Sequence, residues 1–600
     1  MCGISGIIDK SNNHINKSEI RNINDLISHR GPDDEGFFFG ENFAFGHRRL
    51  SILDLSYDGH QPMHYLDGRY TITYNGEVYN YLELREELQQ DGYCFKSDTD
   101  TEVILASYDR WGKSCVERFN GMWAFSIYDK QADIIFCSRD RFGIKPFYYT
   151  EVGGKFIFGS EIKQLLEFYK DRYINNDILL DYLILGLEEH TNETFFDKIY
   201  KLPQSHNLIY DLSENTFKVE KYYEISISPE LKKISEKSSI RLYKEKFVDS
   251  VRIRLRSDVK VGTCLSGGMD SSSIAAVASD IYNKQSNTQF IAIHGKSIED
   301  KTDESIFAKE VAEYCNLNLN IIEPSFEDFV NNIDEVIYTQ EEPFGGVSIF
   351  MQYFVMKKSK ELNCKVMLDG QGADETLFGY ENYFQIILAF YLKKFSILSF
   401  FRIILDINKY QISTLKTVLR SILTLFPQIR IGRIIRKSFI KSKYIDKKRI
   451  KNYYSIDNID SFQRKQITKL NLPHLLRCED KNSMRNSIET RLPFIDYRLV
   501  DLTMNFNIRH KFKSGFLKNI LRKSLQDLLP ESVLWRRNKF GFEAPVDIWT
   551  KKHEAIMLSS IRKSRILQEV VDFNKLKLNN IIIWRLYNIS RWEEIYNIKV

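Results

Sequence analysis

The stretch Val259–Ser279 reads VKVGTCLSGGMDSSSIAAVAS, and it decides the fold of the larger part of the chain. Its apolar beginning, Val259–Leu265, predicts a buried strand, while the small residues of Asp270–Ser279 predict a helix. The Ser-Gly-Gly turn between them lets the backbone approach an anion, to which hydroxyls, N–H groups and the helix N-terminus can donate. A strand, an anion-binding turn and a helix are therefore expected in succession.

The same alternation continues after this stretch. Phe290–His294 predicts a second strand, Ser305–Cys315 a helix, and Val366–Leu368 a further strand that runs into glycines. Strands that alternate with helices indicate a parallel sheet covered by helices, which is an α/β architecture. A polar, charge-rich stretch, Ser226–Lys246, precedes this part, and we place a domain boundary near residue 225.

The residues before this boundary have a different character. They contain short β-branched or aromatic runs that end at Gly, Asp or Asn, with helical patterns between them, which is typical of an α+β domain. The expected strands are Gly36–Gly46, Arg69–Tyr74, Met122–Tyr128 and Ile134–Cys137, and the expected helices are Tyr81–Gln90 and Thr101–Trp111.

Composition limits the class of protein. With 600 residues, 43% of them hydrophobic and 28% charged, the chain should form about two to four domains and not be disordered over most of its length. Its eight cysteines are scattered without a CxxC pair, which argues against a disulfide framework and a structural zinc site and favours a reducing compartment. The sequence has neither a signal-peptide pattern nor a run of 18 uncharged apolar residues, so we expect a cytoplasmic protein.

One segment departs from the rest in charge. Residues 383–451 contain sixteen Lys or Arg and two Asp, a net charge of +14, so the remaining residues carry −9 of the overall +5. The apolar residues of Ile386–Leu405 recur at helical spacing. The segment is expected to be either a solvated face on inserted helices or a docking surface for an anionic membrane, a partner or a charged substrate.

Cys2 is a candidate nucleophile because of what its position allows. Removal of Met1, which a small second residue favours, would give Cys2 a free α-amine with a reference pKa of about 7.7–8.0. Such an amine can act as general base for the thiol of the same residue, and the thiolate can then attack an amide carbonyl.

Several strings in the first 165 residues occur in a fixed order: MCGISG at 1–6, HRGPD at 29–33, RLSILD at 49–54, YNGEVYN at 74–80, SDTDTE at 97–102, RDRFGIKP at 139–146 and GSEIK at 159–163. Together they resemble the N-terminal-nucleophile glutaminase domain of glutamine-dependent amidotransferases, in particular the asparagine synthetase family. The resemblance implies an α+β fold of the αββα sandwich type for this part.

This resemblance assigns roles beside the cysteine nucleophile. The side-chain amide of Asn75 and the N–H of Gly76 would form the oxyanion hole. Arg49 would pair with the carboxylate of glutamine through two parallel hydrogen bonds. Glu77 and Asp100 would hold the α-ammonium group of glutamine.

The loop LSGGMDSS at 265–272 resembles the SGGxDS pyrophosphate-binding loop of enzymes that split ATP into AMP and pyrophosphate, which implies a Rossmann-like α/β ATP-pyrophosphatase fold. Three later strings match the same family: DGQGADE at 369–375, SMRNSIETRLPFID at 483–496 and RNKFGF at 537–542. Asp270 and Asp374 would hold Mg²⁺, because an aspartate in an anion-binding loop needs a cation. The resemblance places ATP beside Leu265, Ser266, Gly267, Gly268, Asp270, Ser271, Ser272, Ile293, Gly370 and Lys539, and the acceptor beside Gln371, Asp374, Glu375 and Arg491.

The resemblance implies a synthetase with two sites, a glutaminase domain at 2–224 and an ATP-pyrophosphatase domain at 225–600, the latter with the basic insertion at about 383–451. Glutamine hydrolysis at Cys2 would send ammonia through an internal tunnel to an acyl-adenylate of aspartate. The products would be asparagine, glutamate, AMP and diphosphate. We expect ATP, Mg²⁺ and small-molecule substrates, no nucleic-acid partner, and a homodimer as one option for the assembly.

Two alternatives stay open. Compact relatives have Ser-Gly-Glu-Gly where this chain has Asp-Gly-Gln371-Gly, so the same chemistry on another carboxylate, such as a uronic acid of a surface polysaccharide, is the first. The second is an RNA-modifying protein whose basic segment grips phosphates. The acidic remainder of the chain and the lack of paired catalytic cysteines near the loop argue against the second.

Overall fold

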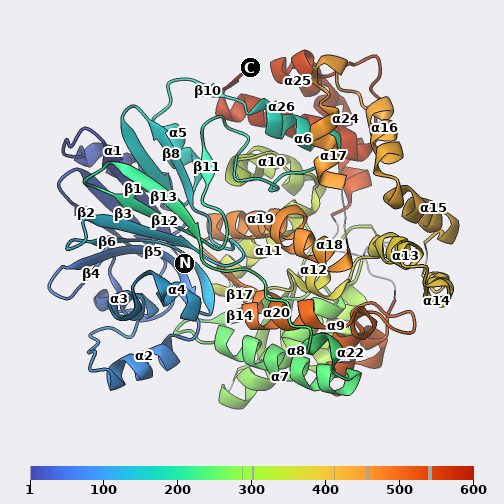
Figure 1. Cartoon of the computed structure of the whole chain (residues 1–600), viewed down its shortest axis with the longest axis horizontal. Helices are drawn as coiled ribbons and strands as arrows, with labels where there is room; N and C mark the ends of the chain where they lie inside the picture. Colours follow the sequence, from blue (N-terminus) through green and yellow to red (C-terminus); the bar gives the residue numbers. More distant parts are fainter. Residues whose placement is uncertain (1, 287, 300–302, 411, 455–457, 538–543) are drawn as a thin grey trace.

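Two antiparallel sheets face each other in the N-terminal part of the chain (Figure 1). The computed structural model describes residues 2–286, 288–299, 303–410, 412–454, 458–537 and 544–600. One sheet has the order β11-β8-β9-β1-β3-β2 and the other β13-β12-β7-β6-β5-β4. The strands are β1 (Gly3–Asp9), β2 (Asp34–Phe39), β3 (Phe43–Arg49), β4 (Met63–Tyr65), β5 (Tyr70–Val78), β6 (Gly121–Asp129), β7 (Ile134–Arg139), β8 (Tyr148–Val152), β9 (Lys155–Gly159), β11 (Tyr200–Lys201), β12 (His206–Asp211) and β13 (Thr216–Lys221).

Helices cover the outer faces of both sheets. α1 (Lys17–Asp25) and α5 (Ile162–Leu166) pack on the sheet of β1, while α3 (Asp100–Trp111), with α2 (Tyr81–Gln90) beside it, packs on the sheet of β5. All nine residues of β5 are buried, because the strand lies between α3 and the sheet of β1. The αββα sandwich is confirmed, although the run expected as one strand over Gly36–Gly46 is the β2–β3 hairpin.

A parallel sheet with the order β16-β15-β14-β17-β18 forms the centre of the second part. Because every pair in it is parallel, the loops after β14 and β17 leave the sheet at the same edge, where α/β proteins bind ligands. The expected α/β architecture is confirmed. Its elements are β14 (Val261–Cys264), β15 (Phe290–Gly295), β16 (Leu317–Ile322), β17 (Val366–Leu368), β18 (Glu489–Arg491), α8 (Met269–Gln285), α9 (Ser305–Tyr314), α10 (Phe326–Gln340), α11 (Ser348–Glu361), α12 (Ala373–Leu377), α20 (Tyr497–Asn505) and α22 (Asn519–Ser524).

The charge-rich stretch Ser226–Lys246, which follows the expected boundary near residue 225, contains the beginning of a long helix. α7 (Glu236–Arg254) begins inside it, with Ser235 as the N-cap residue whose hydroxyl accepts a backbone N–H of the first turn. Tyr243 and Phe247 of this helix are fully buried in the core of the parallel sheet. The helix is amphipathic, and the many charged residues of its exposed face made the spacing of its buried residues hard to recognise in the sequence.

The basic segment 383–451 is helical over most of its length. The run Ile386–Leu405, whose apolar residues recur at helical spacing, lies on two helices, because the chain turns at Phe395, where φ is 53°. None of the described helices of the chain is long and apolar enough to cross a bilayer. The helices of the segment are α13 (Tyr383–Lys393), α14 (Ile397–Ile407), α15 (Thr414–Leu425), α16 (Pro427–Lys437) and α17 (Lys447–Tyr454).

The two parts share one hydrophobic core. α26 (Asn580–Tyr596) lies across their boundary, and its Trp592 ring stands 6.0 and 5.1 Å from the rings of Phe195 and Phe196, measured between centroids. The indole N–H of Trp592 also donates to the carbonyl of Glu341 over 2.7 Å. The remaining elements are α4 (Cys115–Arg118), β10 (Arg172–Tyr173), α6 (Asn176–Leu185), α18 (Ile459–Lys465), α19 (Leu472–Arg485), α21 (Ile508–Lys511), α23 (Glu531–Leu534), α24 (Val546–Lys563), α25 (Arg565–Val570) and β19 (Ile598–Lys599).

Trp592→Ala should destabilise the whole molecule, because the side chain is fully buried in this shared core. We expect a loss of about 3–5 kcal/mol, typical of truncating a buried aromatic side chain. Urea denaturation followed by circular dichroism measures the shift in midpoint. Ile581→Ala is the matched control, since Ile581 lies on the same helix but is 60% exposed; equal shifts in the two variants would contradict the shared core.

Candidate functional site

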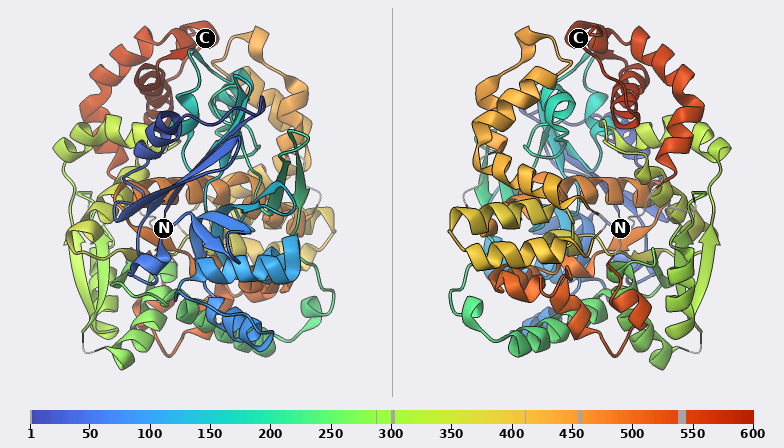
Figure 2. Two further views of the ribbon diagram at one scale, coloured as in Figure 1. Left: turned by 90° about the vertical axis from the view of Figure 1, so that its left-hand side faces the viewer. Right: turned by 90° about the vertical axis from the view of Figure 1, so that its right-hand side faces the viewer.

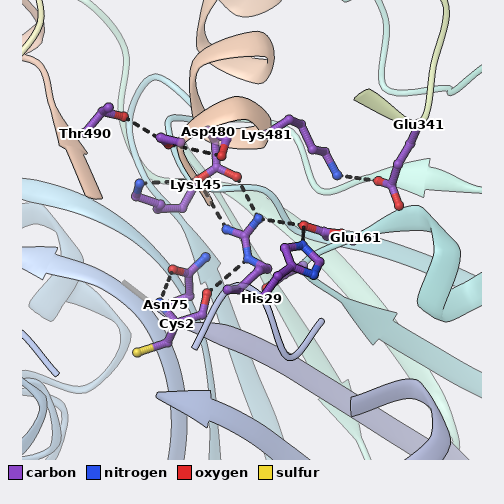
Figure 3. A network of polar contacts seen from close by, with 12 residues as sticks. Cys2, His29, Asn75, Lys145, Glu161, Glu341, Asp480, Lys481 and Thr490 are labelled. Atoms are coloured by element: carbon purple, nitrogen blue, oxygen red, sulfur yellow. Dashed lines mark hydrogen bonds and ion pairs between the residues drawn. The ribbon is translucent and has the colours of Figure 1, made fainter. Parts of the chain in front are cut away.

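The candidate nucleophile stands at the entrance of β1. Cys2 is 8% exposed, its backbone N–H donates to Asn75 Oδ1 over 3.0 Å, and its carbonyl accepts from Arg30 Nε over 3.1 Å. Figure 3 shows Cys2 and Asn75 side by side below a group of charged side chains. Burial raises the pKa of the Cys2 thiol above its ordinary value. The thiol therefore needs a base in order to react.

A buried amide donor lies beside Cys2. The Nδ2 atom of Asn75 is buried and has no hydrogen-bond partner among the described residues, a costly state unless a ligand oxygen accepts from it. The neighbouring Gly76 lies against β6 so closely that a Cβ atom would come 2.1 Å from the carbonyl oxygen of Met122. Position 76 therefore requires glycine. An unsatisfied amide donor next to a thiol fits an oxyanion hole.

Arg49 is oriented by backbone and not by a surface ion pair. It ends β3 and is buried, and its guanidinium donates to the carbonyl of Ser56 over 2.8 Å and to the carbonyl of Asp54. A Cβ atom on Gly59 would come 1.9 Å from Arg49 Nη2, so the glycine leaves the room that the guanidinium occupies.

Three buried carboxyl groups lie close to one another, those of Glu77, Asp100 and Glu489. Asp100 accepts hydrogen bonds of 2.8 Å from the Tyr74 hydroxyl and from the N–H of Val78, yet burial raises its pKa to about 6. Burial and the charges of Glu489 and Asp100 raise the pKa of Glu77 well above its ordinary value. A cation bound beside carboxyl groups with raised pKa values would favour their ionised forms, so this cluster suits a cationic ligand.

Arg491 lies against this carboxyl group cluster. Its Nη2 atom is 3.5 Å from Glu77 Oε1, and its Nε atom donates to Glu489 Oε1 over 2.5 Å. The resemblance places Arg491 on the acceptor side, but the structure does not bring it among the residues that line the nucleotide cleft described below. Because β18 carries Arg491, its contact with Glu77 joins the parallel sheet to the sandwich, and its assignment to the acceptor side stays a prediction.

A buried ionic network continues from Cys2 toward the second part (Figure 3). Arg30, which is fully buried, donates to Glu161 Oε1 over 3.0 Å and to both carboxylate oxygens of Asp480 over 3.0 and 3.2 Å. Lys145 Nζ lies 3.4 Å from Asp480 Oδ1. Although burial opposes it, the charges of Arg30 and Lys145 hold the pKa of Asp480 below its ordinary value. Asp480 is therefore ionised.

α19 connects this network to a second site. Asp480 faces Arg30, whereas His474, Leu475 and Cys478 of the same helix line a cleft of about 600 Å³. The cleft lies where the loops after β14 and β17 leave the parallel sheet. Of the residues that the resemblance assigns, it is lined by Ser266, Gly268, Asp270, Ser271, Gly370, Gln371 and Asp374.

The loop after β14 is held in a fixed shape. The N–H of Ser266 donates to Ser271 Oγ over 3.0 Å, and the two hydroxyl oxygens are 2.9 Å apart. Gly267 has φ of 82°, and a Cβ atom there would come 2.9 Å from backbone atoms of Glu304 and Ala308. The hydroxyls and the N-terminus of α8 thus face one side of the cleft, as an anion requires.

Lys518 joins the two aspartates that the sequence marks as metal ligands. Its Nζ atom lies 2.6 Å from Asp270 Oδ2 and 2.5 Å from Asp374 Oδ1. It precedes α22, far along the chain from both partners, and is buried. A Cβ atom on Gly379 would come 2.0 Å from Lys518 Cε, so this glycine makes room for the lysine. The sequence motifs gave no sign of it.

Other assigned residues support the cleft from outside. Ile293 is a fully buried residue of β15, and its carbonyl accepts the N–H of Leu265 over 2.9 Å, which fixes the start of the loop. Leu265, Gly267 and Ser272 do not line the cleft either. Lys539 lies outside the described residues.

Glu375 is also turned away from the cleft. Its carboxylate accepts from the Tyr380 hydroxyl over 2.9 Å and from Asn471 Nδ2, and burial raises its pKa. Because Asn471 immediately precedes α19, these bonds join α12 to that helix.

Glu479 is a second residue that the motifs missed. It is buried on α19 and makes hydrogen bonds with Gln352 and Gln371, two residues of the cleft. Burial and the nearby charge of Asp369 raise its pKa well above the ordinary value. Its one signal in the sequence is its place shortly before the matched SMRN string, on the helix that runs into that string.

Comparison with known proteins agrees with this geometry. A family model described as a glutamine amidotransferase domain matches residues 1–223, and one described as asparagine synthase matches residues 242–574. The first match holds Cys2 and its neighbours, and the second holds every residue of the cleft.

Two curated relatives match along nearly the whole chain, and a third matches part of it. Asparagine synthetase [glutamine-hydrolyzing] 1 of Bacillus subtilis is 31% identical, covering 99% of this chain and 97% of the relative. Asparagine synthetase [glutamine-hydrolyzing] 3 of the same organism is 30% identical, with full coverage of both. A putative asparagine synthetase [glutamine-hydrolyzing] 2 of Methanocaldococcus jannaschii is 41% identical over 63% of this chain and 76% of its own length. The chain therefore belongs to the family of glutamine-hydrolysing asparagine synthetases.

Proposed function

We propose that this chain forms asparagine from aspartate, with glutamine as the nitrogen donor and ATP as the source of activation. The observation that carries the proposal is the position of α19 between the two sites. One face of this helix is ion-paired to Arg30 beside Cys2, and another lines the cleft of Asp270 and Asp374. A site that releases ammonia and a site that activates a carboxylate are thereby held at a fixed distance.

In the glutaminase half, the Cys2 thiol attacks the side-chain amide of bound glutamine. Asn75 Nδ2 and the N–H of Gly76 donate to the oxygen that becomes negative. The Arg49 fork pairs with the carboxylate of glutamine, while Glu77 and Asp100 hold its ammonium group. The carbon–nitrogen bond breaks, the amide nitrogen leaves as ammonia, and a thioester remains. Water then hydrolyses the thioester to glutamate and regenerates the Cys2 thiol.

In the synthetase half, the phosphates of ATP lie on the loop of Ser266, Gly268 and Ser271, at the N-terminus of α8. Two carboxylates, with phosphate oxygens and water completing the shell, are a usual protein site for Mg²⁺, so Asp270 and Asp374 fit this ion. Magnesium supplies charge neutralisation for the phosphates when bound. Lys518 adds a fixed positive charge at the same place and suits the diphosphate that leaves.

The acceptor lies at the α19 side of the cleft. Gln371 replaces a glutamate of compact relatives there, but Glu479 and Asp369 supply carboxyl groups next to it. These groups suit the α-ammonium group of aspartate. We further propose domains at 2–224 and 225–600, a cytoplasmic homodimer, and a role for Lys539 at the diphosphate.

The direct test incubates the protein with Mg-ATP, amide-¹⁵N glutamine and aspartate, and follows AMP and ¹⁵N-asparagine together. Both should appear in equal amounts. If glutamine is hydrolysed but neither product forms with aspartate, the acceptor assignment is wrong, and AMP formation with uronic acids would support the alternative carboxylate.

Cys2→Ala should abolish the release of glutamate from glutamine, because the chain then lacks its nucleophile. Asn75→Ala should lower kcat of the same reaction by about 10²–10³, as loss of one oxyanion donor does. Asparagine formation from ammonium chloride should persist in both variants. Loss of the ammonia-dependent reaction in Cys2→Ala would contradict two separate sites.

The KM for glutamine should depend on the ionisation of Asp100. Because burial raises the pKa of Asp100 to about 6, the group is mostly protonated at pH 5 and ionised at pH 7.5. The ammonium group of glutamine prefers the ionised form, so KM should fall as pH rises, by about tenfold per pH unit below pH 6. Asp100→Asn should raise KM and remove this dependence; a wild-type KM independent of pH would contradict the role.

Lys518→Met should stop the exchange of labelled diphosphate into ATP, with a loss of about 10² or more if the lysine stabilises the departing diphosphate. Glutamate release from glutamine should stay near wild type. Lys523→Met is the matched control, because Lys523 lies in the adjoining helix but pairs with Glu236 away from the cleft. Equal loss in both variants would assign the effect to folding.

A further inference from the structure

We propose that the surface formed by α14, α15 and the start of α16 docks on an anionic lipid bilayer. We call this surface the basic apolar face. It is defined by the exposed apolar residues of positions 395–429 and the basic residues beside them. In Figure 1 these helices lie at the right-hand margin, and the right view of Figure 2 shows the yellow and orange helices facing the reader.

α14 presents an apolar stripe to solvent. Ile397, Leu398, Phe401 and Leu405 are all exposed, Leu398 to 89%. At about 100° of turn per residue, these four positions fall within roughly 100° of the helix circumference. The opposite side of the helix packs against the protein, since Ile407 is fully buried in a hydrophobic cluster to which α13 also contributes. The stripe is thus not needed for folding.

α15 repeats the arrangement. Leu415, Leu419 and Ile422 are exposed and fall within roughly 60° of its circumference. The buried positions of α15 are the small polar residues Thr417 and Ser421 on the other side. Three of its large apolar side chains therefore lie in solvent, while the most buried positions of the helix are small and polar; Val418 is the apolar residue that packs partly against the core.

This concentration is confined to one region. Of the 28 large hydrophobic side chains that are exposed in the described part of the chain, ten lie within positions 395–429. The remainder are spread over many elements, as is normal for a soluble surface. Phe395, Phe426 and Ile429 belong to the ten and extend the face at the ends of the helices.

Basic side chains border both stripes. Lys394 and Arg402 flank the stripe of α14, and Lys416 and Arg420 flank that of α15; all four are exposed. Long basic side chains can lay their stems on apolar surface and place the charge among lipid headgroups. Positions 395–429 contain four basic residues and one acid, Asp406, and the surrounding segment 383–451 carries +14 while the remaining chain carries −9, so an anionic surface attracts this part of the chain.

The charge also selects lipid over the other occupants. RNA would match the basic residues but not the apolar stripes, and a second copy of the face would bring like charges together. The longest of these helices, α15, has 12 residues and spans about 18 Å, against a hydrocarbon core of about 30 Å. The helices therefore lie in the plane of the interface, as amphipathic basic helices do.

The test uses the full-length protein and sedimentation with vesicles of phosphatidylcholine, alone or with 30% phosphatidylglycerol. We expect binding to the anionic vesicles at least about tenfold tighter, and weaker binding in 0.5 M salt. The triple variant L398Q/F401Q/L405Q should lose about tenfold or more in affinity. The double variant I306Q/I581Q is the matched control, since both residues are well exposed elsewhere; it should bind as wild type.

A charge variant separates the two parts of the argument. Lys394→Gln with Arg402→Gln and Lys416→Gln should weaken binding to anionic vesicles and reduce its dependence on salt. Glutamate release and asparagine formation in solution should be unchanged in every variant, which confirms folding. A second measurement needs no variant: anionic vesicles should slow amide hydrogen exchange in Ile397–Ile407 and Thr414–Leu425.

Three results would overturn the proposal. The first is no binding to either vesicle. The second is equal binding to neutral and anionic vesicles, because charge then plays no part. The third is a dimer, measured by light scattering, that the triple variant dissociates while vesicles leave the exchange rates unchanged, which would make the face a contact between copies.

Discussion

The ion pair between Arg30 and Asp480 is the contact on which the rest of this molecule depends. Both groups are buried, so loss of one partner would leave the charge of the other uncompensated. Breaking a buried pair of this kind costs about 3–5 kcal/mol, so the two halves are tied together near Cys2 itself. Because Arg30 also holds the Cys2 carbonyl, the same residue sets the position of the nucleophile and of α19. The same contacts therefore fix both the position of the nucleophile and the arrangement of the two domains.

The second constraint is the direction of the central strands. Since β14 and β17 are parallel and adjacent, the loops that follow them are brought together although about a hundred residues separate them. Asp270 follows the first loop and Asp374 the second, and Lys518 closes the group from a third segment. The pairing of the strands thus brings the loops together, and the side chains on those loops then line the cleft.

The sequence predicts much of this, and the failures have physical causes. β17 has the bounds that its apolar run indicates, and the helix over Tyr81–Gln90 agrees residue for residue, because local periodicity decides both. Lys518 and Glu479 escape prediction because their partners are distant in sequence, and because neither a lone lysine before a helix nor a lone glutamate within one has a pattern. Arg491 sits inside a strong motif, yet the motif does not say which way β18 faces; the sandwich lies on that side. A sequence motif therefore indicates the region of the fold in which a residue lies, but not the direction in which its side chain points.

The separation of charge along this chain has a consequence for how the molecule moves. Positive charge is collected on helices at one margin, and the excess of negative charge lies elsewhere. Such a molecule has a large permanent dipole moment, and its net charge of +5 describes it poorly. Near a charged surface the electric field turns the molecule before contact is made, so that it meets the surface in a preferred orientation. Ion-exchange media would sense the same asymmetry, and retention would follow the local patch and not the isoelectric point.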